Sequence, residues 1–327
     1  MSMSSVWRAA ALAVLIAVPG VALTGTAHAA GVSVWVASGE LVVKAGGAQV
    51  NKVQVTHAGD LLVVTDAVPI GAGPGCRNYK QTEVHCPAAG VTSLWVDLGD
   101  LGDSFWYKGS LPGVFDGGAG GDVLSGGSGS DKVMGGDGDD YVYGNAGDDA
   151  VYGGVGADRV YGGAGNDVMY GDLSVASPLC ASGTDISCYD HLYGGDGADK
   201  VYGGEWGDLL AGEAGNDLLR DFSGGGAFIG GTGNDSMIGA GPSMRDTVDY
   251  SDHAIAVKVD LGLGTGGQLG EADTIREIQD VQGGAGNDVL IGNSGNNRIE
   301  GLGGALDQAD GADGQDKCFT ETQLHCE

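Results

Sequence analysis

The 327-residue sequence is poor in aromatic and basic residues. Only 5 Phe stand against 66 Gly, and these counts exclude an ordinary globular composition, so a repeat architecture is the first expectation. Lys and Arg number 15 against 44 Asp and Glu. The resulting formal net charge of -29 excludes nucleic acid or an anionic membrane as the default partner, and it makes cations the natural partners.

Two common catalytic motifs are also missing. Neither HExxH nor GxSxG occurs in the sequence. About 80 residues separate the N-terminal segment from the repeats described below, which leaves little room for a catalytic fold. We therefore expect that the protein is not an enzyme.

Long hydrophobic runs are missing except at the N-terminus. There, Arg8 precedes an apolar run over residues 9–18, followed by a Pro-Gly break and the small-residue sequence Ala27-His28-Ala29. This order predicts a secretory signal peptide over residues 1–29, cleaved near Ala29, and hence a secreted, extracellular protein. The alternative, a membrane anchor, is disfavoured because the run is shorter than the roughly 20 residues of a membrane span.

Cysteine usage agrees with export. The six Cys fall into three close pairs: Cys76 with Cys86, Cys180 with Cys188, and Cys318 with Cys326. Six Cys allow 15 connectivities, but proximity in an oxidising compartment favours these three local disulfides. Zinc is the alternative, since His85 and His325 adjoin cysteines, but the CxxC spacing of structural zinc sites does not occur.

From Gly117 the chain repeats every nine residues, as in GGDGDDYVY at 135–143. The eighth residue of nearly every unit is apolar and its neighbours are polar, small or Tyr. This triplet predicts a very short β-strand with one side chain facing a core, and such strands must stack to bury it. The other six residues predict a turn whose glycines allow positive φ and direct carbonyl groups toward one point.

An Asp stands at the sixth position of most units, so each turn combines carbonyl oxygens with one carboxylate. Calcium accepts six to eight oxygen ligands in tolerant geometry, whereas Mg²⁺ requires stricter octahedral order. Ca²⁺ is therefore the predicted ion. Because clustered carboxylates repel one another, we expect the array to be expanded without metal and to fold when Ca²⁺ binds.

The motif resembles the GGxGxDxUx nonapeptide of the RTX, or haemolysin-type, calcium-binding repeat family, over about 117–238 and 283–300. The resemblance implies an all-β fold, a parallel β-roll in which two nonapeptides form one coil and units two apart stack on the same edge. It implies one edge with Asp122, Asp140, Asp158 and Asp208, and another with Asp131, Asp149, Asp167, Asp199, Asp217 and Asp235. A further calcium ligand, Asp288, belongs to the later units.

The composition and residue pattern of the sequence predict four parts. These are the signal peptide 1–29; an N-terminal β cap region, 30–110; a β-roll, 111–240, with an insertion at 172–189; and a last part, 241–327, with linking strands, a second short array and a disulfide hairpin.

The expected function is a secreted calcium-binding protein with a structural or interaction role. The alternative is a calcium-dependent adhesin or carbohydrate-binding protein that uses the 172–189 loop or tyrosine ladders. The ladders would come from the ninth position of the units: Tyr143, Tyr161 and Tyr193 on one sheet, and Tyr152, Tyr170 and Tyr202 on the other. We favour cross-strand stacking that covers each sheet as their role.

Overall fold

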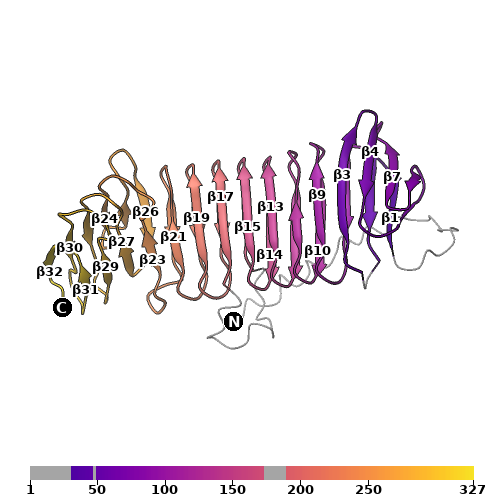
Figure 1. Cartoon of the computed structure of the whole chain (residues 1–327). Helices are drawn as coiled ribbons and strands as arrows, with labels where there is room; N and C mark the ends of the chain where they lie inside the picture. Colours follow the sequence, from indigo (N-terminus) through magenta and orange to yellow (C-terminus); the bar gives the residue numbers. More distant parts are fainter. Residues whose placement is uncertain (1–30, 47–48, 173–188) are drawn as a thin grey trace, which may run out of the picture.

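A computed structural model describes residues 31–46, 49–172 and 189–327. Within these ranges the chain is all-β and forms a parallel β-roll with an N-terminal β cap, which confirms the predicted fold class. Figure 1 shows one long row of stacked coils, with the cap at one end and the C-terminus at the other. None of the described residues forms a helix long and apolar enough to cross a membrane.

The cap adds antiparallel strands to the beginning of both sheets. β1 pairs with β2, β3 with β4, and β7 with both β4 and β6, all antiparallel, while β8 and β9 begin the parallel stacking. The strands are β1 (Val32–Ala37), β2 (Glu40–Lys44), β3 (Lys52–Ala58), β4 (Leu61–Thr65), β5 (Ile70–Ala72), β6 (Arg77–Lys80), β7 (Glu83–Pro87), β8 (Ser93–Asp97) and β9 (Ser104–Lys108).

The repeat array alternates between the two sheets, so that each strand pairs in parallel with the strand one coil away. Its strands are β10 (Gly113–Ala119), β11 (Val123–Ser125), β12 (Lys132–Asp137), β13 (Tyr141–Ala146), β14 (Ala150–Val155), β15 (Arg159–Ala164), β16 (Val168–Tyr170), β17 (His191–Asp196), β18 (Lys200–Tyr202), β19 (Leu209–Ala214), β20 (Leu218–Arg220), β21 (Ala227–Ile229) and β22 (Ser236–Ile238).

The last part continues both sheets. A short antiparallel β24-β25-β26 element interrupts the first sheet, and parallel stacking then resumes. The strands are β23 (Thr247–Asp249), β24 (Lys258–Asp260), β25 (Thr265–Gly266), β26 (Asp273–Arg276), β27 (Asp280–Gln282), β28 (Val289–Ile291), β29 (Arg298–Glu300), β30 (Gln308–Asp310), β31 (Lys317–Phe319) and β32 (Thr322–Leu324).

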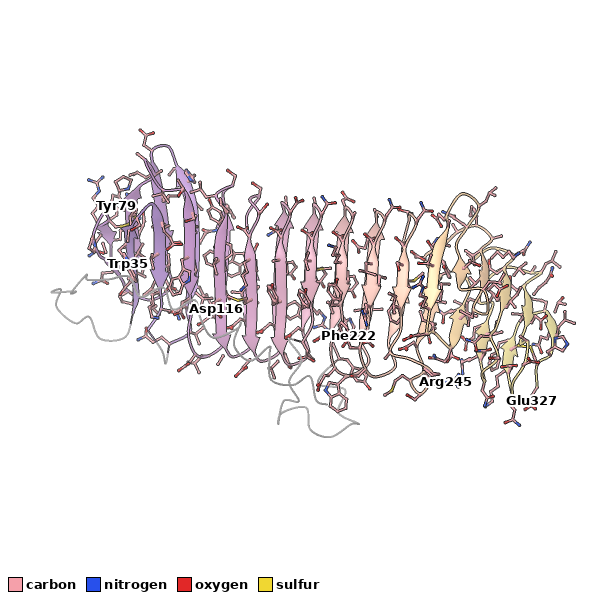
Figure 2. All side chains as sticks on the ribbon, turned by 180° about the vertical axis from the view of Figure 1, so that it is seen from behind. Trp35, Tyr79, Asp116, Phe222, Arg245 and Glu327 are labelled. Carbon is pink, nitrogen blue, oxygen red and sulfur yellow. A yellow bond between two sulfur atoms is a disulfide. The ribbon has the colours of Figure 1, made fainter. Side chains whose placement is uncertain are left out.

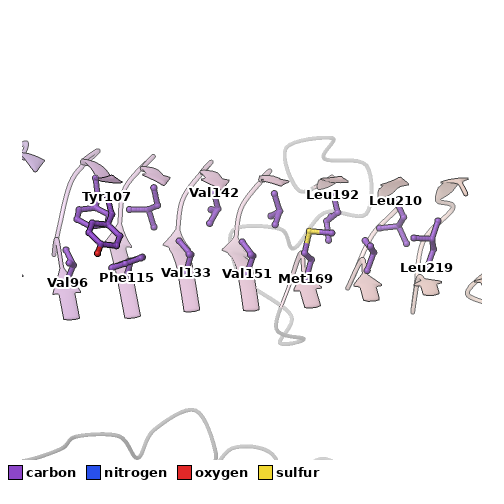
Figure 3. Close-up of a cluster of buried hydrophobic side chains, with 14 of the residues drawn as sticks. Val96, Tyr107, Phe115, Val133, Val142, Val151, Met169, Leu192, Leu210 and Leu219 are labelled. Carbon is purple, nitrogen blue, oxygen red and sulfur yellow. The ribbon is translucent and has the colours of Figure 1, made fainter. Parts of the chain in front are cut away.

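The core is a double row of single side chains, one from each triplet (Figure 3). Val133 and Val151 come from one sheet and Val142 and Leu192 from the other, and all four are fully buried. Burying such a side chain contributes about 1.5–3 kcal/mol. One buried side chain in nine residues is a thin core, so the turns have to contribute to stability as well.

The two tyrosine ladders have the predicted members. Ring centroids lie 4.8 Å apart between Tyr143 and Tyr161 and 5.0 Å between Tyr161 and Tyr193, with nearly parallel planes. On the other sheet the Tyr170 ring stacks on those of Tyr152 and Tyr202 at 5.3 and 4.9 Å. Because the ring faces contact one another, the ladders hold neighbouring coils together.

Two of the three predicted disulfides lie among the described residues, Cys76–Cys86 and Cys318–Cys326. The Cys180–Cys188 pair, nearly all of the 172–189 insertion and the signal peptide lie outside them. The predicted C-terminal hairpin is wrong in its strand pairing. β31 pairs with β29 and β32 with β30, so the last two strands belong to opposite sheets and complete a coil that the disulfide closes.

Candidate metal centre

The aspartates at the sixth position of the repeats form two ladders, one along each edge of the roll. The backbone N–H of each Asp donates to Oδ1 of the Asp one coil later, over 2.7–2.9 Å. One ladder contains Asp122, Asp140, Asp158, Asp190 and Asp208; the other contains Asp131, Asp149, Asp167, Asp199, Asp217 and Asp235. The predicted aspartates therefore stack in the predicted order, with Asp190 added.

The second carboxylate oxygen distinguishes these residues from ordinary turn aspartates. A turn aspartate normally accepts a backbone hydrogen bond or faces water. Here Oδ2 is buried and has no hydrogen-bond partner among the described residues in Asp122, Asp140, Asp149, Asp158, Asp167, Asp190, Asp199, Asp208, Asp217 and Asp235. A buried oxygen that carries negative charge without a donor is costly, so each of these atoms needs a positively charged partner.

The first glycine of the unit lies so close to that oxygen that no side chain would fit there. A Cβ at Gly144, Gly162 or Gly194 would lie 2.5 Å from Oδ2 of its own turn's Asp. The same point lies 2.6 Å from the carbonyl oxygen of the first glycine in the next coil. A side chain at this position would collide with both oxygens, so only glycine allows the carboxylate of one coil and the carbonyl of the next to come this close together.

Positive φ angles at the second and fourth positions shape this turn. Gly136 and Gly138 have φ of 121° and 133°, and even Asn145 adopts 79° at a second position. We call a turn open when both positions have positive φ. Open turns begin at residues 117, 135, 144, 153, 162, 194, 203, 212, 230, 301 and 311.

Four other turns are closed, meaning that the sixth-position side chain accepts the N–H of the second residue of its own turn. Gly127 donates to Oδ2 of Asp131, and Gly284 donates to Oδ2 of Asp288, each over 2.8 Å. The turn that contains Asn297 closes in the same way, and so does the longer turn 239–246, in which Asp246 is the eighth residue. Asp131 and Asp288 were predicted as calcium ligands, but a hydrogen bond from the chain itself occupies the oxygen that the other predicted aspartates leave unpartnered.

The electrostatics of the open turns favour a cation. Considering the protein's own groups alone, burial raises the pKa of Asp158 to about 8, and nearby Asp140 adds to this effect. Burial likewise raises the pKa of Asp149 and Asp199 to about 7 and that of Asp122 to about 6. A bound cation would reverse this penalty on the charged form, because opposite charge stabilises the carboxylate.

The available donors determine which cation fits. Nowhere in the described part of the chain do three or more His, Cys, Asp or Glu side chains gather as a metal cluster. A site in this array would therefore combine one or two carboxylates with main-chain carbonyls. An oxygen-only set of this kind suits Ca²⁺ and does not suit zinc or copper, which prefer nitrogen and sulfur.

Three aspartates of the same kind were missed from the sequence. Asp190 follows the insertion, Asp307 lies in a unit of ten residues, and Asp316 lies in GADGQDKCF, whose spacing fits the motif. Asp316 is fully buried with an unpartnered Oδ2. The interpretation of the C-terminus as a hairpin concealed this last unit.

Comparison with known families supports the same assignment. The RTX calcium-binding nonapeptide repeat matches in four copies, at residues 116–151, 143–173, 189–205 and 280–305. No curated protein matches the chain. The matched residues include both open and closed turns, so family membership of a repeat does not determine its turn type. The sequence match over these segments, the parallel roll and the turn geometry agree that the chain contains RTX calcium-binding nonapeptide repeats folded as a β-roll.

Proposed function

We propose that this calcium-binding β-roll protein is secreted, that its repeats fold when they bind Ca²⁺ outside the cell, and that it has a structural or interaction role. The observation that carries the proposal is the row of buried Asp Oδ2 atoms without a hydrogen-bond donor. Among the described residues between 117 and 238 there are eleven such atoms, ten in the two ladders and one in Asp221, and so many cannot all be accidents of single turns.

The physical basis of folding on calcium is charge. Burial raises the pKa of Asp158 to about 8, and the charge of the stacked Asp140 carboxylate raises it further, so without a cation the ionised carboxylates destabilise the folded roll. Calcium, when bound, supplies positive charge to both coils. The residues hold their oxygens in place through the N–H to Oδ1 ladder, and the glycines keep the space beside Oδ2 clear. Because the ligands come together only in the roll, binding free energy becomes folding free energy.

Secretion is supported by the predicted signal peptide 1–29 and by the two disulfides, since disulfides persist in oxidising compartments. A calcium-poor cytoplasm would leave the chain loose before export, and calcium outside would then fold it. We propose calcium ions as the partners and expect neither nucleic acid nor catalysis, because the repeat is a metal-binding motif and the net charge is -29.

The adhesin alternative is less well supported. The tyrosine rings stack face to face within each ladder, so their faces are already in contact with protein. The stacking of a sugar ring would require a free aromatic face.

A calcium titration followed by far-UV circular dichroism tests the proposal, with magnesium as control. We expect a cooperative transition from coil to β-structure with Ca²⁺ and not with Mg²⁺. A chain that is fully β-structured in chelator would contradict folding on calcium.

A further inference from the structure

The unit 221–229, DFSGGGAFI, has lost the repeat motif but has a carboxylate in an unusual place. Its sixth position is Gly226, and its first position is Asp221, where the other nonapeptides of the array have glycine. Figure 2 shows the adjacent Phe222 on the lower rim of the roll, between Asp116 and Arg245. By sequence alone this unit has no calcium ligand.

The Asp221 side chain replaces the missing one in space. It is 1% exposed, and its Oδ2 has no hydrogen-bond partner among the described residues. A Cβ added at Gly226 would lie 2.8 Å from this Oδ2, so the carboxylate of Asp221 reaches the place from which a sixth-position side chain would extend. Its Oδ1 accepts the N–H of Phe222 over 2.7 Å, which fixes the direction of the group.

The same carboxylate also faces the preceding coil. The space beside Gly203 is bordered by Oδ2 of Asp208, as in other open turns, and Oδ1 of Asp221 lies 3.0 Å from the same point. In the ordinary turns a main-chain carbonyl oxygen borders this space from the next coil. Here a carboxylate oxygen takes the place of that carbonyl, so two buried carboxylates converge.

Among the described residues, no Lys, Arg or His forms an ion pair with Asp208 or Asp221. The Arg220 guanidinium lies over the Phe222 ring, 4.7 Å from its centroid. In the following coil Asp246 accepts hydrogen bonds from Gly226 and Ala240, so its carboxylate is already satisfied. Asp208 and Asp221 therefore form the last unsatisfied carboxylate pair on this edge before the closed turns.

We propose that Asp221 and Asp208 form a calcium site between turns 203–208 and 221–226, in which a first-position carboxylate replaces the sixth-position one. This inference rests on the proposed calcium binding of the array and extends it to a unit outside the family match. The site holds two carboxylates where a regular pair of coils brings a carboxylate and a carbonyl to the same space, and a hard divalent ion is the ligand that this pair accepts.

Trp206 gives this site its own spectroscopic probe. It lies in the same open turn, with φ of 79°, and its backbone N–H donates to Oγ of Ser223 in the next coil. Tb³⁺, which replaces Ca²⁺ at oxygen sites, emits when a nearby Trp is excited near 295 nm, whereas the tyrosine ladders absorb little there. Trp206→Phe identifies the share of emission that comes from this residue.

The experiment counts bound calcium by equilibrium dialysis and measures Trp-excited Tb³⁺ emission in the purified protein. Asp221→Gly, which restores the usual glycine, and Asp221→Asn should each bind one ion fewer and lose the Trp206-dependent emission several-fold. The exposed Asp196→Asn, in the unit before Trp206, is the matched control for net charge and should change neither readout.

A rescue separates a ligand from a merely structural residue. The double variant Asp221→Gly with Gly226→Asp moves the carboxylate to the usual sixth position and should restore both the ion and the emission. Asp221 variants that keep the full ion count and the emission would overturn the proposed site. If the unsubstituted protein bound no calcium, the proposed function itself would fail, and the two failures are thus distinguishable.

Discussion

The array at 117–238 and the segment at 239–300 have the same coil but satisfy their buried carboxylates differently. In most turns of the array Oδ2 has no donor within the described chain. In the later segment the protein supplies the donor: Ala240 N–H for Asp246, the Tyr250 hydroxyl for Asp273, and Gly284 N–H for Asp288. The comparison teaches that the same coil can leave a buried carboxylate oxygen without a donor or can supply the donor from the protein itself.

The N-terminal end of the array resembles the later segment in this respect. Asp103 begins one ladder by donating its N–H to Asp122, and Asn51 donates to both oxygens of Asp103. Asp131 begins the other ladder with a closed turn. On both sides, the coils whose Asp Oδ2 has no donor among the described residues are therefore flanked by coils in which the protein supplies the donor.

Removal of calcium should produce the largest difference in protease resistance between the array and the later segment. Arg159 in β15 and Arg298 in β29 are both exposed, and each precedes a buried apolar residue. After chelation we expect trypsin to cleave after Arg159 at least about tenfold faster, because proteolysis follows the population of the open form. Cleavage after Arg298 should change much less. Peptide mass spectrometry over time measures both rates, and equal acceleration at the two sites would contradict the distinction.

Acidification should stabilise the metal-free array, in contrast to its calcium-bound form. The folded-state pKa is raised to about 8 for Asp158 and about 7 for Asp140, against about 4 in an unfolded chain. A raised folded pKa contributes stability that is present below about pH 4 and is lost as the pH rises through 7 to 8. Between pH 5 and pH 8 the metal-free array should therefore be most stable near pH 5, and its melting temperature should fall until the folded array is lost as the pH approaches 8.

With calcium the dependence should reverse, because protons compete with the ion for the same oxygens. Melting curves at several pH values, with and without calcium, measure both trends. The exposed Asp137→Asn controls for net charge. A metal-free melting temperature that rises from pH 5 to pH 8 would be inconsistent with buried, unsatisfied carboxylates.

The same Asp→Asn substitution should have different effects on calcium binding and on stability in an open turn and in a closed turn. Asp158→Asn removes an unpartnered oxygen, so at least one ion should be lost, together with about 2.7 kcal/mol of calcium-dependent stability at 100 times Kd. Asp131→Asn instead places an amide where Gly113 and Gly127 both donate N–H groups. It should destabilise the protein with or without calcium, and the ion count should stay the same. Calorimetric titration and urea unfolding give the two readouts, and loss of an ion in Asp131→Asn would refute the closed-turn interpretation.

The smallest change in the free energy of unfolding is expected when Tyr250 is substituted. Its hydroxyl donates to Oδ2 of Asp273 over 2.8 Å in a buried site. Tyr250→Phe leaves this oxygen without its donor and should cost about 1–3 kcal/mol, equally with and without calcium. Tyr161→Phe, in a stacked ladder, serves as the control and should cost less. Unchanged urea unfolding of Tyr250→Phe would show that the hydroxyl does not replace a cation there.

The fold could be predicted from the sequence because the nine-residue period places apolar, glycine and aspartate residues at fixed positions of each unit. One apolar residue in each triplet predicted the core, and the resemblance to the RTX repeat implied the stacking of the aspartates along two edges. The same local reasoning predicted the Cys76–Cys86 and Cys318–Cys326 disulfides. These features depend on residues within one unit or on regular stacking, so a single unit contains nearly all of the information.

Turn type could not be predicted because it depends on the preceding coil. GGSGSD at 126–131 has the full motif, but the chain beneath it at 109–113 is not a repeat, and the turn closes. GGAGND at 283–288 likewise follows the irregular 253–257. In contrast, Gly118 lies against Gly99 in the segment 98–103, where Gly99 and Leu101 have the positive φ of an open turn. Asp221 was missed because its carboxylate reaches the site from the wrong position in the unit.

Long-wavelength anomalous diffraction from crystals of the calcium-loaded protein tests the central claim most directly. Anomalous peaks should appear beside open-turn aspartates such as Asp140, Asp149 and Asp158, and none should appear beside Asp131 or Asp288. Peaks of equal height at the closed turns, or open turns without peaks, would contradict the account.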